Sequence, residues 1–379
     1  MGNNMAAKNA EWIQHPGAYI KAEMEERGWI QRDLAFILGA PETAVNMILS
    51  GKRGITADMA KALGDAFDVS AEFFANLQQT YDMARARSPY SGIQERRRMQ
   101  TAFPVREMIK RKWIEQADTA MLETQLMRFF GAESVEDIPY MPHAAKRSHY
   151  EDREIPPAQL AWLFRVRQIA GSVSVPKYSA NRLRSALREF EPLLLEPEGV
   201  RDVPRILMEC GIRFVIVEKL PGADIDGVCF WLDDSSPVIG LTTRRDTIDN
   251  FWFLVRHEVE HVLRGHGKER EILDDLAGEK ASPNVPSEEE RVANVAAGDF
   301  CAPSEKLDRF IVRKKPFFYE RDVLAFAGIN LRHPGLVVGQ MQFKLDNYRY
   351  LTRHLVKVRQ FVLPGAIADG WGQTVPVSL

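Results

Sequence analysis

Residues 251–263 read FWFLVRHEVEHVL, and the rest of the chain is interpreted from this stretch. Its apolar first half predicts a buried helix, and the H-E-x-x-H motif that follows places His257 and His261 on one face of that helix. Two imidazoles so placed can bind one Zn²⁺, and Glu258 beside them can take a proton from a metal-bound water. A polar helix face that carries two histidines by chance is the simpler alternative. A metal would explain why polar groups stand on a buried helix.

The composition is that of a soluble globular protein. The chain has 379 residues, enough for two or three domains, with 45% hydrophobic residues, 27% charged residues and a net charge of −2. No apolar run reaches the length of a membrane span, and the first residues lack a signal-peptide pattern. Cys210, Cys229 and Cys301 are too widely spaced for a disulfide framework or a zinc knuckle. We therefore expect a cytoplasmic protein whose cysteines are small buried side chains.

Short helices are predicted near the start of the chain, over residues 17–27, 31–38 and 42–49. The second and third of these flank the turn Gly39-Ala40-Pro41. Two short helices around a glycine-containing turn are typical of a helix-turn-helix.

Four segments in this region carry a more specific resemblance. They are QRDLA at 31–35, SGKRGIT at 50–56, AKAL at 60–63 and FDVSAEFFANLQ at 67–78. Together they resemble HigA-type antitoxins, which are XRE-class helix-turn-helix proteins. The resemblance implies binding to double-stranded operator DNA as a homodimer, with the 42–49 helix in the major groove. The side chains expected to contact DNA are Gln31, Thr43, Asn46, Lys52 and Arg53.

Charge leaves a second interpretation of this region open. Residues 1–80 carry seven Lys or Arg against ten Asp or Glu, so the same fold could instead bind a protein. Residues 83–115 carry nine basic against three acidic side chains, which could hold a DNA backbone or form a solvated surface. We predict a helix-turn-helix domain at 1–82, a basic linker and small helical region at 83–150, and a further domain at 151–379.

Three strands are predicted before the motif helix, at residues 212–217, 227–232 and 238–242. The edge of such a sheet can pair with an extended substrate backbone. A catalytic zinc needs a third protein ligand, and the cluster Glu288-Glu289-Glu290, which opens a later helix, can supply it. Spacing alone does not choose among these three glutamates.

Seven short segments of residues 155–345 resemble the ImmA/IrrE family of metallopeptidase domains. They are DG at 226–227, IGLT at 239–242, RD at 245–246, IDNFWF at 248–253, HEVEH at 257–261, ERVAN at 290–294 and HPGLVVGQ at 333–340. The resemblance implies a zincin-like domain in which His257, His261 and Glu290 hold Zn²⁺. Glu258 is then the general base.

Other polar residues near these segments are candidates for supporting roles. His333 or His266 could hold the oxyanion, although an ordinary surface histidine is the alternative for His266. Asp246 or Asp249 could hydrogen-bond a zinc-ligating imidazole, whereas Asp249 could equally cap its helix. The tail from residue 365 contains several Gly and Pro residues and is expected to be loosely ordered.

The predicted fold class is α+β, with an all-α helix-turn-helix domain, a helical linker region and a zincin-like C-terminal domain. Such a protein is expected to act as a DNA-binding regulator whose zinc endopeptidase domain cleaves a protein partner, such as a repressor or a cognate toxin. Two alternatives remain. One is a non-catalytic antitoxin or repressor whose C-terminal domain senses a ligand or partner, and the other is a protease whose N-terminal domain binds only protein.

Overall fold

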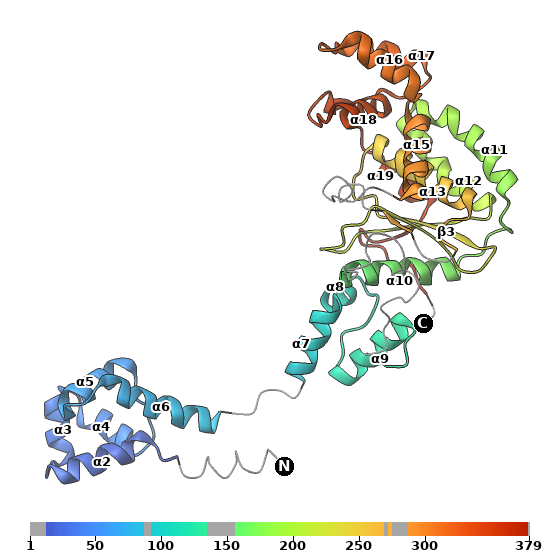
Figure 1. The fold of residues 1–379 in the computed structure, drawn as a ribbon. Coiled ribbons are helices and arrows are strands. Elements are labelled where there is room, and N and C mark those ends of the chain that lie inside the picture. Colours follow the sequence, from blue (N-terminus) through green and yellow to red (C-terminus); the bar gives the residue numbers. More distant parts are fainter. Residues whose placement is uncertain (1–12, 87–91, 135–155, 269–271, 275–286, 378–379) are drawn as a thin grey trace. The chain divides into compact units, whose positions relative to one another are not determined.

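The computed structural model describes residues 13–86, 92–134, 156–268, 272–274 and 287–377 (Figure 1). The chain divides into two compact units, residues 1–93 and 94–379, each with its own hydrophobic core. This division differs from the predicted one, because the helices after residue 93 belong to the C-terminal unit instead of forming a region of their own. Residues 135–150, at the end of the predicted linker region, lie outside the described residues.

The N-terminal unit is all helical. Its helices are α2 (Pro16–Glu26), α3 (Gln31–Leu38), α4 (Glu42–Leu49), α5 (Ala57–Phe67) and α6 (Ala71–Arg85). Ile20, Leu34, Val45, Leu63 and Phe74 form the centre of its core, one from each helix, and each is almost fully buried. The predicted helices over 31–38 and 42–49 are confirmed with the same bounds.

The C-terminal unit combines helices with one sheet. Its helices are α7 (Ile93–Ala102), α8 (Val105–Lys110), α9 (Thr119–Phe130), α10 (Pro157–Ser172), α11 (Ala180–Phe190), α12 (Val203–Glu209), α13 (Ile248–Arg264), α15 (Glu288–Cys301), α16 (Ser304–Lys314), α17 (Glu320–Ile329), α18 (Pro334–Leu345) and α19 (Arg359–Val362). Short 3₁₀ turns are η1 (Glu191–Leu195), η2 (Pro197–Asp202), η3 (Thr352–His354) and η4 (Leu363–Gly365).

The sheet has the strand order β4-β2-β3-β1-β5. The strands are β1 (Arg213–Val217), β2 (Gly227–Trp231), β3 (Pro237–Leu241), β4 (Ile272–Asp274) and β5 (Ile367–Asp369). β1 is parallel to β3 and β5, whereas β2 is antiparallel to β3 and β4. The three predicted strands are therefore confirmed, and the predicted α+β class holds for the described residues.

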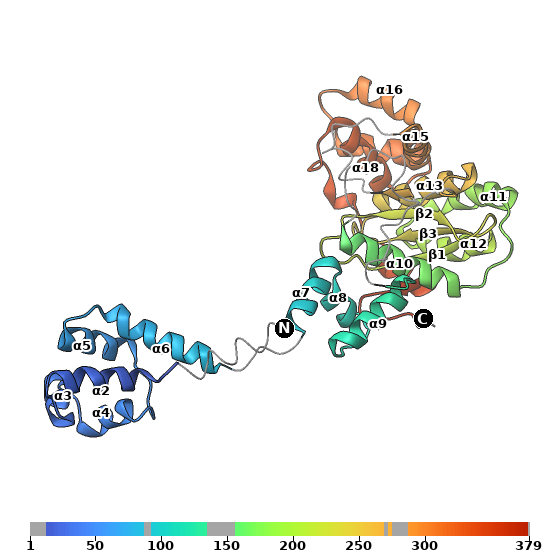
Figure 2. The same cartoon turned by 60° about the horizontal axis from the view of Figure 1, so that its bottom comes forward.

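Helices cover both faces of the sheet (Figures 1 and 2). Alternating side chains of the central strands build two cores, one on each face. Val215 and Val217 of β1 pack with α10, together with aromatic residues of α9. Phe214 and Ile216 of the same strand pack with α11, α12 and α13. This alternation follows from the period of two along a strand, and it places α13 directly on the sheet.

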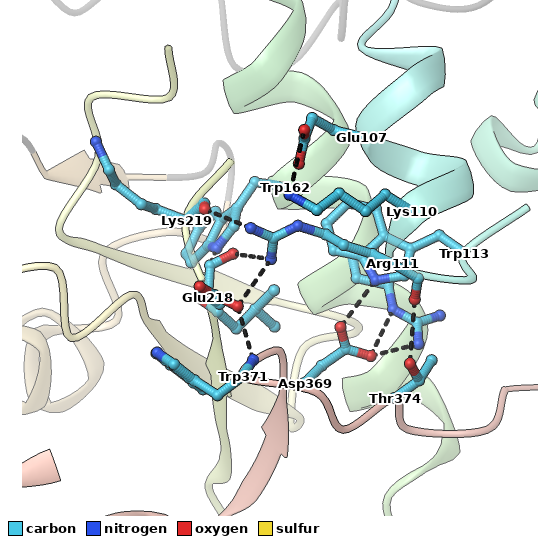
Figure 3. A network of polar contacts seen from close by, with 12 residues as sticks. Glu107, Lys110, Arg111, Trp113, Trp162, Glu218, Lys219, Asp369, Trp371 and Thr374 are labelled. Atoms are coloured by element: carbon cyan, nitrogen blue, oxygen red, sulfur yellow. Dashed lines mark hydrogen bonds and ion pairs between the residues drawn. The ribbon is translucent and has the colours of Figure 1, made fainter. Parts of the chain in front are cut away.

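The expectation of a loosely ordered tail is wrong for residues 367–377. β5 pairs with β1, and Asp369 at its end is buried and forms an ion pair with Arg165 of α10. The Asp369 carboxylate also accepts hydrogen bonds from Trp113 Nε1 (2.8 Å) and from the backbone N–H of Val375 (3.0 Å). Figure 3 shows how this network joins the α8–α9 segment to the sheet, with Arg111 donating to the carbonyl oxygens of residues 218 and 219. No described helix is both long and apolar enough to cross a membrane.

Candidate metal centre and nucleic-acid interface

Helix α13 carries the H-E-x-x-H motif on a well-defined framework. Thr247 is its N-cap, and Gly265 ends it with the left-handed conformation (φ 73°) that glycine adopts without strain. The apolar residues before the motif, including Phe251 and Trp252, are buried in the core above the sheet. His257 and His261 lie one turn further and are completely buried, as predicted for one helix face.

Helix α15 crosses α13 and supplies the third group. Ser287 caps α15 by accepting a hydrogen bond from the backbone N–H of Glu290. Glu290 shares a helix face with the buried residues Ala293, Ala297 and Cys301, at helical spacings of three, seven and eleven. These small side chains let the two helices approach closely, so the carboxylate of Glu290 reaches α13. Glu288 instead pairs with Arg291 at the surface.

Three donor atoms converge between these helices. The Nε2 atoms of His257 and His261 are 2.9 Å apart, and they lie 3.3 and 3.5 Å from the two carboxylate oxygens of Glu290. Zinc ligands at about 2.0–2.1 Å in tetrahedral geometry are separated by about 3.3 Å. Two imidazoles and one carboxylate are also a donor set that zinc prefers. The residues present therefore fit a zinc ion.

The two glutamates inside the motif have different environments. Glu260 forms ion pairs with Arg256 (2.8 Å) and Arg264 (2.6 Å), one turn before and after it on α13. Glu258 is completely buried and lies against β2, where a β-carbon on Gly227 would be 2.1 Å from its Oε1 atom. The charge of Glu260 is thus balanced by two arginines of its own helix, whereas Glu258 lies on the side of the helix that faces the sheet.

His266 is the residue whose role the sequence reasoning missed. Its Nδ1 atom lies 3.0 Å from Nδ1 of His261, and the two ring centroids are 5.2 Å apart. The sequence predicts it only as a group that could hold the oxyanion or as a surface histidine. The signal that could have found it is the sequence Gly265-His266-Gly267 directly after the helix, because two glycines allow a sharp reversal of the chain.

His333, predicted as a group that could hold the oxyanion, has a structural role at the start of a helix. It is the N-cap of α18, where its Nδ1 accepts a hydrogen bond from the backbone N–H of Gly335 (3.0 Å). Its own backbone N–H donates to the carbonyl oxygen of Leu194. Burial lowers the pKa of His333, which keeps the ring neutral and able to accept this bond. Pro334 follows it at the first position of the helix, where a proline is well tolerated.

Neither aspartate predicted to support a zinc ligand contacts one. The Asp246 carboxylate accepts hydrogen bonds from the backbone N–H groups of Val358 (3.0 Å) and Arg359 (2.7 Å), so it holds the start of α19. Asp249 lies in the first turn of α13 and faces Gly339 of α18, where a β-carbon would be 2.5 Å from its Oδ2 atom. Its Oδ1 atom is buried without a hydrogen-bond partner, and burial raises the pKa of its carboxyl group.

All three cysteines are buried, as expected, and none forms a disulfide with another described residue. Burial raises the pKa of the Cys210 thiol to about 11 and also raises the pKa of Cys301. A thiol that stays protonated is a poor nucleophile, so Cys210 and Cys301 act as core side chains.

The N-terminal unit presents a helix-turn-helix formed by α3 and α4. Gly39 ends α3 in the left-handed conformation (φ 59°), and Pro41 is the N-cap of α4. The Gln31 side chain donates a hydrogen bond to the carbonyl oxygen of Glu42 (3.1 Å) and so ties the starts of the two helices together. Arg32 forms an exposed ion pair with Glu42 (3.3 Å), which offsets one acidic charge on this surface.

The other predicted DNA contacts are accessible. Thr43 and Asn46 are exposed on α4, one helical turn apart, while Val45, Ile48 and Leu49 of the same helix are buried. Lys52 and Arg53 are exposed in the turn after α4, where both backbone N–H groups donate to the carbonyl oxygen of Met47. Neither forms an ion pair with another of the described residues.

The basic run expected either to hold DNA or to be solvated is partly helical. Arg96, Arg97 and Arg98 are exposed on α7, whose buried residue is Met99. Arg111 is instead engaged with the sheet, including an ion pair with Glu218 at 3.7 Å. Exposure leaves both interpretations of the α7 arginines open, whereas Arg111 has a structural role.

Comparison with known proteins identifies the class of the N-terminal unit. The helix-turn-helix family model matches residues 20–74. Virulence-associated protein A′ of Dichelobacter nodosus is 37% identical over 82 residues, which cover 21% of this chain and 71% of the relative. The chain therefore belongs, through this segment, to the XRE-type helix-turn-helix family.

Two solved structures are similar to the chain over a single small domain. The antitoxin HigA of Pseudomonas aeruginosa, solved with the higBA promoter, is 41% identical over 19% of this chain and 79% of its own length, with a TM-score of 0.19. A HigA-family addiction module antidote protein of Coxiella burnetii is 30% identical over 23% of this chain and 91% of its own length, also with a TM-score of 0.19.

Proposed function

We propose that this protein is a DNA-binding regulator whose C-terminal unit is a zinc-dependent endopeptidase of ImmA/IrrE type. The observation that carries the enzymatic part is the convergence of His257, His261 and Glu290, with Glu258 buried beside them. The membership of residues 20–74 in the helix-turn-helix family carries the DNA-binding part.

Operator recognition is supported by the surface of the N-terminal unit. Asn46 can form a bidentate pair with an adenine edge, and Lys52 and Arg53 can neutralise phosphates next to it. A homodimer would place two copies of α4 in successive major grooves, about 34–36 Å apart. The relative from Pseudomonas aeruginosa was solved with promoter DNA, which favours this interpretation over a domain that binds only protein.

Peptide hydrolysis is supported by the arrangement of donors and carboxylates. His257, His261 and Glu290 would hold the ion, which would act as a Lewis acid and acidify a water molecule. Glu258 would accept the proton of the attacking water and later deliver it to the leaving amine. The outer edge of β4, the last described strand on that side of the sheet, would align an extended peptide by backbone hydrogen bonds, and its partner β2 lies against Glu258.

The experiment that tests this function uses the full chain purified without a metal-binding tag. We expect about one zinc ion per chain, and cleavage of a co-expressed cognate repressor or toxin that Glu258→Gln abolishes while zinc content stays unchanged. Absence of zinc after zinc-replete expression would reject the metal site, and unaltered cleavage by Glu258→Gln would reject the general base. A gel shift on DNA from the protein's own promoter should weaken as salt rises.

A non-catalytic regulator is the second candidate. The observation that favours it is that His333, the predicted oxyanion group, caps α18 with its Nδ1 atom. In that case the three ligands would hold a metal that senses a partner or stabilises the unit. Zinc binding without cleavage of any neighbouring gene product would support this candidate.

A further inference from the structure

His266 meets His261 through two different bonds. The backbone N–H of His266 donates to the carbonyl oxygen of His261 at 2.9 Å, which is the long bond of the turn that ends α13. The side chain then comes back beside the same residue, with the two Nδ1 atoms 3.0 Å apart. The turn therefore fixes where the ring of His266 lies before any metal binds.

The strand β2 holds this turn from the other side. Trp231 Nε1 donates a hydrogen bond to the carbonyl oxygen of His266 at 2.9 Å. Gly267 has φ 81°, and a β-carbon there would lie 2.8 Å from the carbonyl oxygen of Cys229. Only glycine permits this approach to the strand, so His266 is clamped between the helix end and the sheet.

Which of the two rings donates in the hydrogen bond between His261 and His266 depends on which nitrogen of His261 faces the other candidate ligands. The Nε2 atom of His261 points to His257 and Glu290, at 2.9 and 3.5 Å. An imidazole that offers Nε2 to a metal carries its proton on Nδ1, and Nδ1 of His266 lies 3.0 Å from that nitrogen, within hydrogen-bond distance. His266 must then accept with Nδ1 and carry its own proton on Nε2.

We infer that His266 is a positioning residue that accepts the Nδ1 proton of His261 and thereby holds the metal-ligating nitrogen toward Glu290. This inference rests on the proposed metal site and gives that site a partner that lies outside the H-E-x-x-H motif. The partner of a ligating imidazole fixes the ring's tautomer and orientation, and its loss typically weakens metal binding by about 10–100-fold.

The test compares two substitutions of nearly equal shape in the full chain. His266→Asn keeps a hydrogen-bond acceptor near the position of Nδ1, whereas His266→Leu fills a similar volume without one. His354→Ala is the matched control, because His354 pairs with Glu320 and not with the metal ligands. Zn²⁺ affinity is measured by competition with a chromophoric chelator, and the visible spectrum of the Co²⁺-loaded protein reports the ligand geometry.

We expect His266→Leu to bind Zn²⁺ about 10–100-fold more weakly than wild type and to change the Co²⁺ spectrum. His266→Asn should recover most of the affinity and the wild-type spectrum, and His354→Ala should leave both unchanged. Equal affinity of His266→Leu and wild type would overturn the inference, as would equal weakening in the Asn and Leu variants. If His266→Leu does not fold, the spectrum of His266→Asn decides, since an altered spectrum overturns the inference and an unaltered one supports it.

Failure of the proposed function gives a different result. A wild-type protein that binds Zn²⁺ but cleaves no partner removes the endopeptidase proposal, while the affinities of the variants still decide the role of His266. A wild-type protein that binds no Zn²⁺ overturns both proposals.

Discussion

Gly227 of β2 lies directly against the carboxylate of Glu258, because a β-carbon at this position would be 2.1 Å from Oε1. The strand thus leaves room for the buried acid that the proposed hydrolysis requires. Gly227 also pairs with Leu241 of β3 and Asp274 of β4, so its backbone is held on both sides and has little freedom to move away.

Gly227→Ala should therefore displace Glu258 and abolish cleavage without removing zinc. Overpacking of this kind lowers the free energy of unfolding by about 1–3 kcal/mol. Urea unfolding, zinc content and cleavage of the protein partner check this result. Gly171→Ala is the control, since a β-carbon at residue 171 of α10 meets nothing within 4 Å and should not destabilise the protein. Full cleavage by Gly227→Ala would show that Glu258 tolerates displacement.

Glu290→Gln should lose zinc binding, whereas Glu288→Gln should keep it. The reason is the helix face, because Glu290 lies 3.3 Å from His257 Nε2 and Glu288 pairs with Arg291 in solvent. Zinc at 100 times its dissociation constant stabilises a folded protein by about 2.7 kcal/mol. A chelator should lower the melting temperature of wild type and Glu288→Gln but leave that of Glu290→Gln unchanged. If the chelator lowered the melting temperature of Glu290→Gln but not that of Glu288→Gln, the third ligand would be Glu288 and not Glu290.

Asn46→Ala and Lys52→Ala should weaken operator binding in different ways. Loss of a bidentate base contact costs about 1–3 kcal/mol and relaxes specificity at one base pair, whereas loss of a phosphate contact weakens all sequences and lowers the salt dependence by about one ion. Fluorescence anisotropy with operator and scrambled duplexes over a salt series separates these effects. Lys61→Ala removes an equally exposed charge from α5 and should change neither quantity. Equal losses for Lys61→Ala and Lys52→Ala would indicate a general charge effect.

Asp369→Ala should destabilise the C-terminal unit by about 3–5 kcal/mol, because it leaves the buried guanidinium of Arg165 without its partner. It also removes the acceptor of Trp113 Nε1 and of the Val375 backbone. Thermal unfolding monitored by tryptophan fluorescence measures this loss. Glu305→Ala breaks the exposed pair with Arg309 and should cost less than about 1 kcal/mol. A similar small effect of Asp369→Ala would mean that β5 contributes little to stability.

Asp249→Asn should stabilise the protein at neutral pH. Burial raises the pKa of Asp249 above its ordinary value of 3.8, so the folded state keeps this proton to higher pH than the unfolded state. Stability is then lost as pH rises from about 4 through the raised pKa. Asparagine avoids this loss, so the difference in melting temperature should be positive at pH 7 and shrink toward pH 4.

Asp233 is a useful comparison, because its pKa is shifted in the opposite direction from that of Asp249. The hydrogen bond from the backbone N–H of Ser235 lowers the pKa of the Asp233 carboxyl group, so its contribution to stability is present at neutral pH and lost as pH falls through the lowered pKa. Asp233→Asn should therefore destabilise the protein at pH 7 and not at low pH. If both variants changed stability with pH in the same direction, burial would not be raising the pKa of Asp249.

Much of the local structure could be predicted from the sequence. The helices over 31–38 and 42–49 follow from hydrophobic spacing with Gly39 between them, and both ends were predicted correctly. His257 and His261 needed no tertiary information, since four residues along one helix bring two side chains to one face. The three longer strands were also visible, because each is a compact run of apolar residues between turns.

Long-range contacts decided the rest. β5 was missed because a three-residue strand has almost no sequence signal, and its partner β1 lies about 150 residues earlier in the chain. His333 and Asp246 were assigned to the metal site from their neighbours in sequence, whereas their hydrogen bonds are made to the ends of α18 and α19. A side chain's partner depends on how helices and strands pack, and sequence spacing carries no information about that packing.

The sequence by itself determined the helix-turn-helix and the pair of histidines, since both depend on contacts within a few residues. Sequence spacing left three glutamates open, and a family resemblance pointed to Glu290. Only the tertiary structure showed that the Glu290 side chain faces those histidines, and that His266 returns to His261 after the helix ends. The physical reason is that a metal site needs donor atoms within a few ångströms of one another, and the crossing of α13 and α15 and the glycine turn against β2 set those distances.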